Sequence, residues 1–453
     1  MTEEKTSDSL LGRICNLLDR FSGDKVIFLI ALFLMLISVI SVFSSTPLLA
    51  RERGTDRMLI MVDQLKAVAL GFGIIFVLYY FGRMEWYRAL SKWGFAVSFG
   101  ILVILVFHLN LGFIKASPIN GAWRILSVAG KQIHVYEFVK VFMILYLGWA
   151  LDTFKNHEFR LLPALSGLSP RLAFLQKDIW QKIAYIYFPI ASTTLMIMMG
   201  SNSSALFIGG IMILMILVGG IDKKDVFSMF AVLLIGVGCM YGAYKMGWLK
   251  NSRIGTAISR ITQNDDDTME KMVRSPRGSK DWNDARDELQ QPVGALLAIK
   301  EGGLLGKGIG NSTQKYAVPV IFGDYMFSFI VEETGLWGAT LLILLYFSLL
   351  ARGTLVAKNC DKYYDKMIVT GLTILVTGQA FMHMAVNVHL PFIPQTGQTL
   401  PLVSHGTNSL LVFSLVFGIL LSISKDAREN LARREEEAKP LIDYTEWTQN
   451  TTQ

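Results

Sequence analysis

Long apolar blocks recur along the 453-residue chain and limit its possible folds more than any other feature. Each block has roughly 17 to 25 predominantly apolar residues, the length that an α-helix needs to cross the hydrocarbon core of a bilayer. We count ten, at 26–45, 60–81, 93–113, 135–152, 182–199, 205–221, 226–246, 322–350, 367–386 and 402–424. The sequence therefore predicts an all-α polytopic membrane protein with about ten transmembrane helices.

The composition excludes the other broad classes of protein. Charged residues make up only 17% of the chain and hydrophobic residues 52%, whereas soluble domains carry roughly 25% charged residues. A disordered chain would not keep 28 Phe and 9 Trp in solution. The cysteines Cys15, Cys239 and Cys360 lie far apart, so they predict neither a disulfide framework nor a zinc site.

The distribution of Lys and Arg predicts the orientation in the membrane. With the N-terminus inside, the segments assigned to the cytoplasm carry 23 of these residues, and the opposing short connections carry 6. Cytoplasmic connections hold such an excess in membrane proteins. We therefore expect both termini inside, and we interpret the net charge of +7 as a result of topology rather than a sign of a nucleic-acid partner.

The predicted organisation has three parts: a cytoplasmic segment 1–25, a transmembrane domain 26–424 and a cytoplasmic tail 425–453. We interpret the first apolar block as a retained anchor. Within the domain, residues 247–321 form a large extracytoplasmic loop, and the Pro- and Gly-rich connection 387–401 is too apolar for an exposed loop. Irregular backbone at membrane depth must be buried in protein or line a cavity, so we expect 387–401 to re-enter the membrane from outside.

Glu137 and Lys140 lie three residues apart and share one face of a predicted helix. A lone charge at membrane depth costs about 2.5–3.5 kcal/mol on insertion scales, so the two are expected to neutralise each other. They form either a structural ion pair or part of a pocket for an anionic headgroup. Arg124 just upstream is either a surface arginine or a bidentate phosphate ligand.

A glycine-rich run at 302–312 superficially resembles a phosphate loop. It fails as a Walker motif, because Glu301 stands where the motif needs glycine and Gly308 follows Lys307 instead of Ser or Thr. A re-entrant turn that needs positive φ values is favoured over direct contact with a substrate.

Asp324 begins an apolar helix, where aspartate is commonly an N-cap. The alternative is a general base at the water–lipid boundary. Glu332 and Glu333 follow in the same helix, and at least one should point into the bundle because a carboxylate facing lipid is costly. His405 is predicted to be satisfied by the backbone of its own loop.

These residues resemble the shape, elongation, division and sporulation (SEDS) proteins, the FtsW/RodA family, over nearly the whole chain. The resemblance rests on Gly302–Ser312 with Gln314 and Lys315, Pro319 with Asp324, Glu332–Gly335, Gln379, Asn387 and the connection Pro394–Ser409. The sequence departs from the family at Ile125, Asn202, the segment 320–323 and parts of 404–409. The sequence of residues 396–402 is more similar to the division branch, FtsW, than to the elongation branch, RodA.

The resemblance implies a peptidoglycan glycosyltransferase that polymerises lipid II at the outer face of the cytoplasmic membrane. Asp324 would deprotonate the acceptor hydroxyl, Arg124 and Lys140 would stabilise the departing pyrophosphate, and Glu137 would orient Lys140. The other implied substrate-binding residues are Gln291, Lys307, Asn311, Ser312, Gln379, Asn387, Gly397 and Ser404.

The resemblance also implies partners and cofactors. The family works with a class B penicillin-binding protein, a transpeptidase, among the other membrane proteins of the divisome or elongasome. No nucleotide or redox cofactor is needed, because lipid II carries its own leaving group, and a divalent cation such as Mg²⁺ or Mn²⁺ would help to neutralise the diphosphate.

Two other functions stay open from the sequence. A lipid II flippase would use the same polar groove, although it needs polar groups that continue to the cytoplasmic side. A non-catalytic scaffold that recruits the transpeptidase is kept open by Asn202 and the altered last connection.

Overall fold

The computed structural model describes residues 21–221 and 265–438, except 113, 120–121, 129, 168, 391–392, 394 and 396, together with 227, 242 and 246. Six of the described helices are long and apolar enough to cross a membrane. They are α2 (Lys25–Ser45), α4 (Arg57–Phe81), α5 (Met84–Val106), α15 (Met326–Asn359), α16 (Tyr363–Asn387) and α17 (Thr407–Ala438). The prediction of a mostly helical membrane protein is confirmed. The count of ten spans stays a prediction, since 226–246 lies almost wholly outside the described residues.

The fourth to sixth predicted spans are also helical in the structure. α6 (Val135–Lys155) covers the fourth, and α10 (Asn202–Val218) covers the sixth. The fifth is a continuous run of α8 (Asp178–Lys182), a π-helical turn η2 (Ile183–Tyr187) and α9 (Phe188–Met198). Between α6 and α8 lie a short helix α7 (Leu161–Ser166) and a 3₁₀ segment η1 (Pro170–Gln176).

Close packing of helices builds the core. α17 packs along α4, α16 along α15 and α6 along α5, and Phe413 and Phe417 of α17 are fully buried. A Cβ on Gly94 of α5 would come within 2.5 Å of the carbonyl oxygen of Phe142 on α6. Small residues allow such close approach of backbones in membrane bundles.

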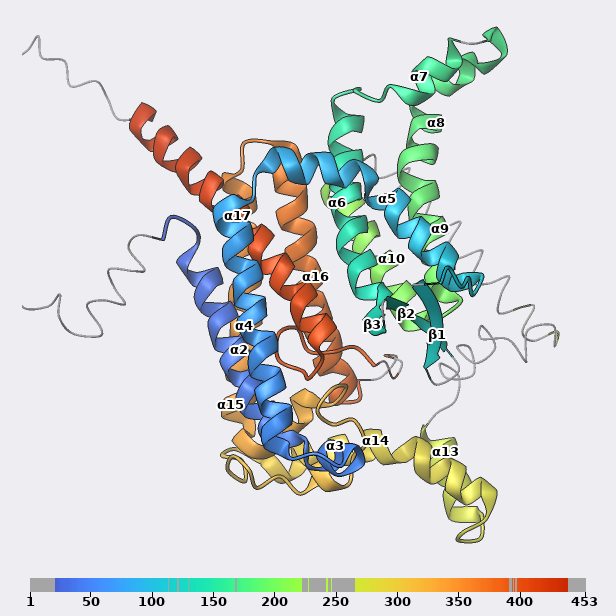
Figure 1. The fold of residues 1–453 in the computed structure, drawn as a ribbon, viewed down its shortest axis with the longest axis vertical. Coiled ribbons are helices and arrows are strands. Elements are labelled where there is room, and N and C mark those ends of the chain that lie inside the picture. Colours follow the sequence, from blue (N-terminus) through green and yellow to red (C-terminus); the bar gives the residue numbers. More distant parts are fainter. Residues whose placement is uncertain are drawn as a thin grey trace, which may run out of the picture.

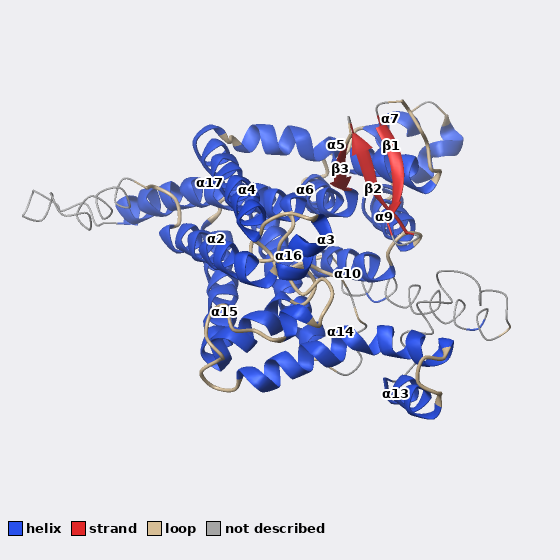
Figure 2. Cartoon of the chain, turned by 60° about the horizontal axis from the view of Figure 1, so that its bottom comes forward, coloured by secondary structure: helices blue, strands red, loops and turns tan. Residues whose placement is uncertain are grey.

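A three-stranded antiparallel sheet was not predicted and corrects the all-α expectation. β1 (Ile114–Ile119), β2 (Ala122–Val128) and β3 (Lys131–His134) lie side by side in chain order, next to α9 (Figure 2). Pairing of Ile125 with His134 fixes the second hairpin, and Gly130 supplies the positive φ of 81° that its turn needs. The sheet places Arg124 on β2 and leads the chain directly into α6.

The predicted large loop contains helices where the structure describes it, and its residues 247–264 lie outside the described part. α13 (Asp265–Arg274) is followed by α14 (Lys280–Gly302), and a 3₁₀ turn η3 (Gln314–Tyr316) leads towards α15. Figure 1 shows α14 beside the short helix α3 (Pro47–Arg53) at one end of the bundle, with α7 and the end of α17 at the other. The residues before α4 and before α15 thus lie at one end, and the connection after α6 lies at the other. Which end faces the cytoplasm stays a prediction.

Candidate functional site

Asp324 lies just before α15 and is not its N-cap. The N-cap is Tyr325, which makes no side-chain capping bond. The backbone N–H of Asp324 donates to the carbonyl of Val320 at 3.1 Å, within a tight turn that ends at the helix. The N-cap alternative is therefore wrong, and the carboxylate is available for another role.

The surroundings of Asp324 disfavour its negative charge. Burial raises the pKa of this carboxyl from 3.8 to about 6, and the nearby charge of Arg124 opposes the rise. Among the described residues, no hydrogen bond to the carboxylate compensates for the lost water. A carboxylate in this state is mostly ionised at neutral pH but accepts a proton readily, which suits a general base.

The connection after α16 is clamped against the segment that carries Asp324. A Cβ on Gly397 would lie 2.9 Å from Oδ2 of Asp324, so only glycine leaves the carboxylate in its place. The Ser404 hydroxyl donates to the carbonyl of Gly323 at 2.7 Å, and the His405 N–H donates to the carbonyl of Phe322 at 2.9 Å. The sequence predicted that 387–401 re-enters the membrane, and Gln398 and Leu400 of this connection are buried. Re-entry into the membrane itself stays a prediction.

One face of α16 holds both the connection and the start of α15. Nδ2 of Asn387 donates to the carbonyl of Asp324 at 3.0 Å, and its Oδ1 accepts from the N–H of Ser328 at 2.9 Å. His383 lies one turn earlier, with Nδ1 2.7 Å from the carbonyl oxygen of Gln398 and Nε2 accepting from Phe327 N–H at 3.3 Å. Asn387 and His383 thus position Asp324 through the backbone.

Lys140 occupies the polar centre beside this connection. Its ammonium donates to Oε1 of Glu137 at 2.8 Å, Oε1 of Gln379 at 2.7 Å and Oε1 of Gln398 at 3.3 Å. Only 2% of the residue is exposed. An ammonium has three donors, so an incoming phosphate would have to replace one of these acceptors. The predicted Glu137–Lys140 ion pair is confirmed, and it lies within a pocket of amides.

A cluster of candidate residues therefore comes from β2, α6, the segment before α15, α16 and the last connection. Its members are Arg124, Glu137, Lys140, Asp324, Gln379, Asn387, Gly397 and Ser404. Gln398 connects Asp324 with Lys140. It follows Gly397, which lies against the Asp324 carboxylate, and its own side chain accepts from Lys140. Arg124 is exposed, and its charge acts on Asp324.

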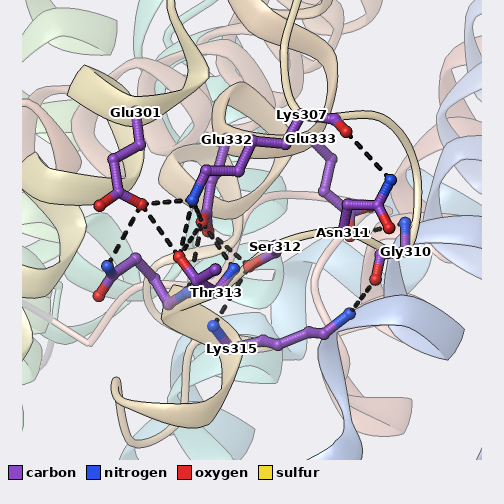
Figure 3. A network of polar contacts seen from close by, with 10 residues as sticks. Glu301, Lys307, Gly310, Asn311, Ser312, Thr313, Lys315, Glu332 and Glu333 are labelled. Carbon is purple, nitrogen blue, oxygen red and sulfur yellow. Dashed lines mark hydrogen bonds and ion pairs between the residues drawn. The ribbon is translucent and has the colours of Figure 1, made fainter.

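Lys307, Asn311 and Ser312 lie in a second network around Glu332 and Glu333 (Figure 3). Lys307 forms ion pairs with Glu301 and, at 2.8 Å, with Glu332. The Ser312 hydroxyl donates to Glu332 at 2.5 Å, and Asn311 Nδ2 donates to the Lys307 carbonyl at 3.1 Å. These contacts fasten the glycine-rich run to α15. Substrate contact by these three residues stays a prediction.

Both α15 carboxylates point into the protein, as predicted for at least one of them. Glu332 is fully buried and Glu333 is 4% exposed, and the hydroxyl of Ser44 on α2 donates to Glu333 at 2.6 Å. The glycines of the run at 303, 306, 308 and 310 all have positive φ, in agreement with the predicted turn.

The predicted partner of His405 was wrong. Its Nδ1 lies 3.0 Å from Oε1 of Gln64 on α4 rather than against the backbone of its own loop. Burial lowers the pKa of His405 to about 4, so the ring is neutral at physiological pH. Gln291 lies half-buried on α14, and no hydrogen bond found in the described part of the chain ties it to the Asp324 cluster.

Sequence reasoning missed His383 and Gln398. A signal for His383 existed, because residues 379, 383 and 387 are spaced by four and so share one face of α16. No such periodicity marks Gln398, whose place depends on the fold of an irregular connection.

The described residues contain no group of three or more His, Cys, Asp or Glu side chains placed to hold a metal ion. The protein groups around Asp324 do not make a metal site by themselves, and we derive no step through a cation.

Comparison with known proteins places this geometry in a family. The model of the FtsW/RodA/SpoVE family, described as "Cell cycle protein", matches residues 24–429. The chain is 26% identical over 406 residues to a probable peptidoglycan glycosyltransferase FtsW of Geobacter sulfurreducens, covering 88% of this chain and 95% of the relative. It is 26% identical over 413 residues to the stage V sporulation protein E of Bacillus subtilis, covering 90% and 98%.

Solved structures share the fold. A chain from a peptidoglycan synthase complex that coordinates polymerization and crosslinking aligns with a TM-score of 0.64 and 18% identity, covering 89% of this chain and 98% of that one. The rod shape determining protein RodA of Thermus thermophilus aligns with a TM-score of 0.55 and 18% identity, covering 90% and 99%. The match over residues 24–429 shows that the chain belongs to the FtsW/RodA/SpoVE family of cell cycle proteins.

Proposed function

We propose that this protein is a peptidoglycan glycosyltransferase that polymerises lipid II at the outer face of the cytoplasmic membrane. Membership of the family and the name of its FtsW relatives support this function. The observation that carries it is Asp324, an isolated carboxylate with a pKa raised to about 6 beside a cationic side chain. A general base for a sugar hydroxyl needs these properties.

In the proposed reaction, the Asp324 carboxylate accepts the proton of the acceptor sugar 4-hydroxyl. The oxygen then bonds to the anomeric carbon of the donor as its bond to the diphosphate breaks. Arg124 and Lys140 stabilise the charge on the departing diphosphate, and Glu137 and Gln379 orient Lys140. Gly397 leaves room for the carboxylate, and Asn387 fixes its backbone.

The orientation follows from the same proposal. Both termini would be cytoplasmic, ten helices would span the membrane, and the Asp324 cluster would face outward. The excess of Lys and Arg at the opposite end supports this arrangement.

A class B penicillin-binding protein is the proposed partner, with other divisome or elongasome membrane proteins around it. The similar fold of a chain from a complex that coordinates polymerization with crosslinking supports this pairing. Apolar side chains such as Leu90 and Trp93 are exposed on α5. They form a surface that lipid or a helix of the partner could cover. The sequence of 396–402 favours the division branch.

The direct test incubates the purified protein with labelled lipid II, alone and with its transpeptidase partner. The expected product is glycan polymer. Movement of lipid II across a vesicle without polymer would instead support the flippase, and neither activity, with the partner still bound, would support the scaffold. A divalent cation, if required, would show as loss of polymer with a chelator and recovery with Mg²⁺ or Mn²⁺.

A further inference from the structure

A cavity of about 460 Å³ lies between the start of α2, the last part of α15 and the C-terminal part of α17. Arg352 in its wall is paired with Asp24 at the start of α2, whereas Ser38, 14 residues further along α2, donates to the carbonyl of Val403 in the connection that packs on the Asp324 segment. Fourteen residues correspond to about 20 Å of helix at 1.5 Å per residue. The cavity is therefore at the other end of the bundle from the Asp324 cluster, where α17 ends in Figure 1, and plays no part in the proposed reaction.

Positive charge exceeds negative charge in the lining of this cavity. Among the described residues, Lys25, Arg352 and Arg428 line it together with one carboxylate, Asp24. The guanidinium of Arg352 donates to Oδ2 of Asp24 through Nε at 3.0 Å and Nη2 at 2.5 Å. Asp24 also caps α2, accepting from the N–H groups of Val26 and Ile27 at 3.0 Å. The carboxylate is thus fully engaged and holds Arg352 at the wall.

Arg428 adds a cation that makes one long contact with the described part of the chain. Its Nη1 donates to the carbonyl of Gly23 at 3.5 Å, and the residue is exposed. A guanidinium has five N–H donors in a planar fork that matches phosphate oxygens. Arg428 can therefore bind an anion without breaking an ion pair within the protein.

The rest of the lining is mostly apolar. Five aliphatic side chains, Val26, Leu355, Val356, Ala427 and Leu431, lie beside Gly23 and the polar residues Asn359 and Ser424. A cavity lined by both cations and aliphatic side chains suits an amphiphile with a phosphate next to a hydrocarbon chain. A volume of 460 Å³ lies within the range of about 300–1,000 Å³ of small-molecule sites.

We propose that this cavity binds the headgroup of an anionic phospholipid, with its phosphodiester on Arg428 and Arg352 and its glycerol and upper acyl chain along α15 and α17. The apolar lining and the position at the ends of membrane helices favour a lipid over free phosphate. Basic pockets between transmembrane helices at the cytoplasmic side bind such headgroups in other proteins. The site is at the end that the distribution of Lys and Arg in the sequence predicts to be cytoplasmic, and it does not depend on the glycosyl transfer proposed above.

The test measures binding of phosphatidylglycerol to the purified full-length protein in detergent by native mass spectrometry, with phosphatidylcholine as the zwitterionic comparison. We expect Arg428→Gln to weaken phosphatidylglycerol binding about fivefold, the effect of one Lys or Arg near an anionic lipid. Lys358→Gln is the matched control, because Lys358 is exposed on the last turn of α15 and does not line the cavity. It should leave binding unchanged.

A thermal measurement on the unaltered protein keeps the test independent of how the variants fold. Phosphatidylglycerol should raise the melting temperature more than phosphatidylcholine does, because a ligand that binds only the folded state stabilises it. Equal losses in Arg428→Gln and Lys358→Gln, or equal binding of the two lipids, would overturn the proposal. Binding of glycerol 1-phosphate as tight as that of the lipid would overturn the lipid as occupant.

Discussion

At the scale of single residues, Asp324 is held where its charge destabilises the folded protein. A rise in pKa from 3.8 to about 6 corresponds to at most about 3 kcal/mol at high pH. The folded protein binds this proton more tightly than the unfolded chain does. The unfavourable term is therefore absent below the unfolded pKa and complete once the pH has risen past the folded pKa.

Asp324→Asn should accordingly raise the melting temperature at pH 8, because the amide removes the charge and keeps the shape. The gain should shrink as the pH falls through 6 and vanish near pH 4. Asp63→Asn is a matched control, since Asp63 is a largely exposed carboxylate on α4. Loss of stability at pH 8 in Asp324→Asn would show that the carboxylate serves the fold instead.

Lys140 can be tested with its partner. Lys140→Met alone should lower stability by up to about 3–5 kcal/mol, because it leaves the partly buried carboxylate of Glu137 unpaired. Glu137→Gln in the same chain should restore most of this loss. Melting temperatures and polymerisation are then compared among the unaltered protein, the two single variants and the double variant. We expect the double variant to be folded and inactive, since the cation that meets the diphosphate is gone. Activity in the double variant would mean that Glu137 and Lys140 form a structural ion pair and take no part in the reaction.

At the scale of elements, the connection after α16 is expected to control activity through Gly397. Gly397→Ala should lower kcat by an order of magnitude or more, because the added methyl group displaces the Asp324 carboxylate. Gly406→Ala lies in the same connection, where an added Cβ would meet only Ser409 at 3.8 Å, and should retain activity. Similar rates for the two variants in a lipid II polymerisation assay would contradict this placement.

The glycine-rich run should behave as a structural element. In Gly306→Ala, the φ of 77° is strained and the Cβ would collide with the backbone carbonyl of Glu333. Gly310→Ala carries similar strain at a φ of 89° with open space around it, so it should cost only about 1–2 kcal/mol. We expect Gly306→Ala to melt lower and to be cleaved faster by protease within 301–315. Equal behaviour would mean that the run is not docked on α15.

The elements differ in how far the sequence predicts them. Spans such as 26–45 and 60–81 are predictable, because the bilayer sets a length that apolar residues must fill. The strands at 114–134 are not, since their short pattern is the same as that of a polar connection. Asp324, Arg124 and Lys140 were identified as candidates by charge and spacing, but the contact of Gln398 with Lys140 depends on an irregular backbone. The contacts of Lys307 and Ser312 with Glu332 are likewise seen only in the structure.

At the scale of the whole molecule, the protein has two chemically different ends. Among the described residues, one end gathers the Asp324 cluster, the β-sheet and α14, and the other end holds the cationic cavity (Figure 1). In the proposed orientation the two ends lie on opposite sides of the membrane, so a reaction at Asp324 and a lipid contact at Arg428 would be separated by the bundle.

The most direct measurement of the central claim is polymerisation of labelled lipid II by Asp324→Asn, with its transpeptidase partner present and with Asp63→Asn as control. The account predicts no glycan polymer from Asp324→Asn, although this variant is folded and more stable at pH 8, and normal polymer from Asp63→Asn. Polymer from Asp324→Asn at the rate of the unaltered protein would contradict the role of Asp324 as the base.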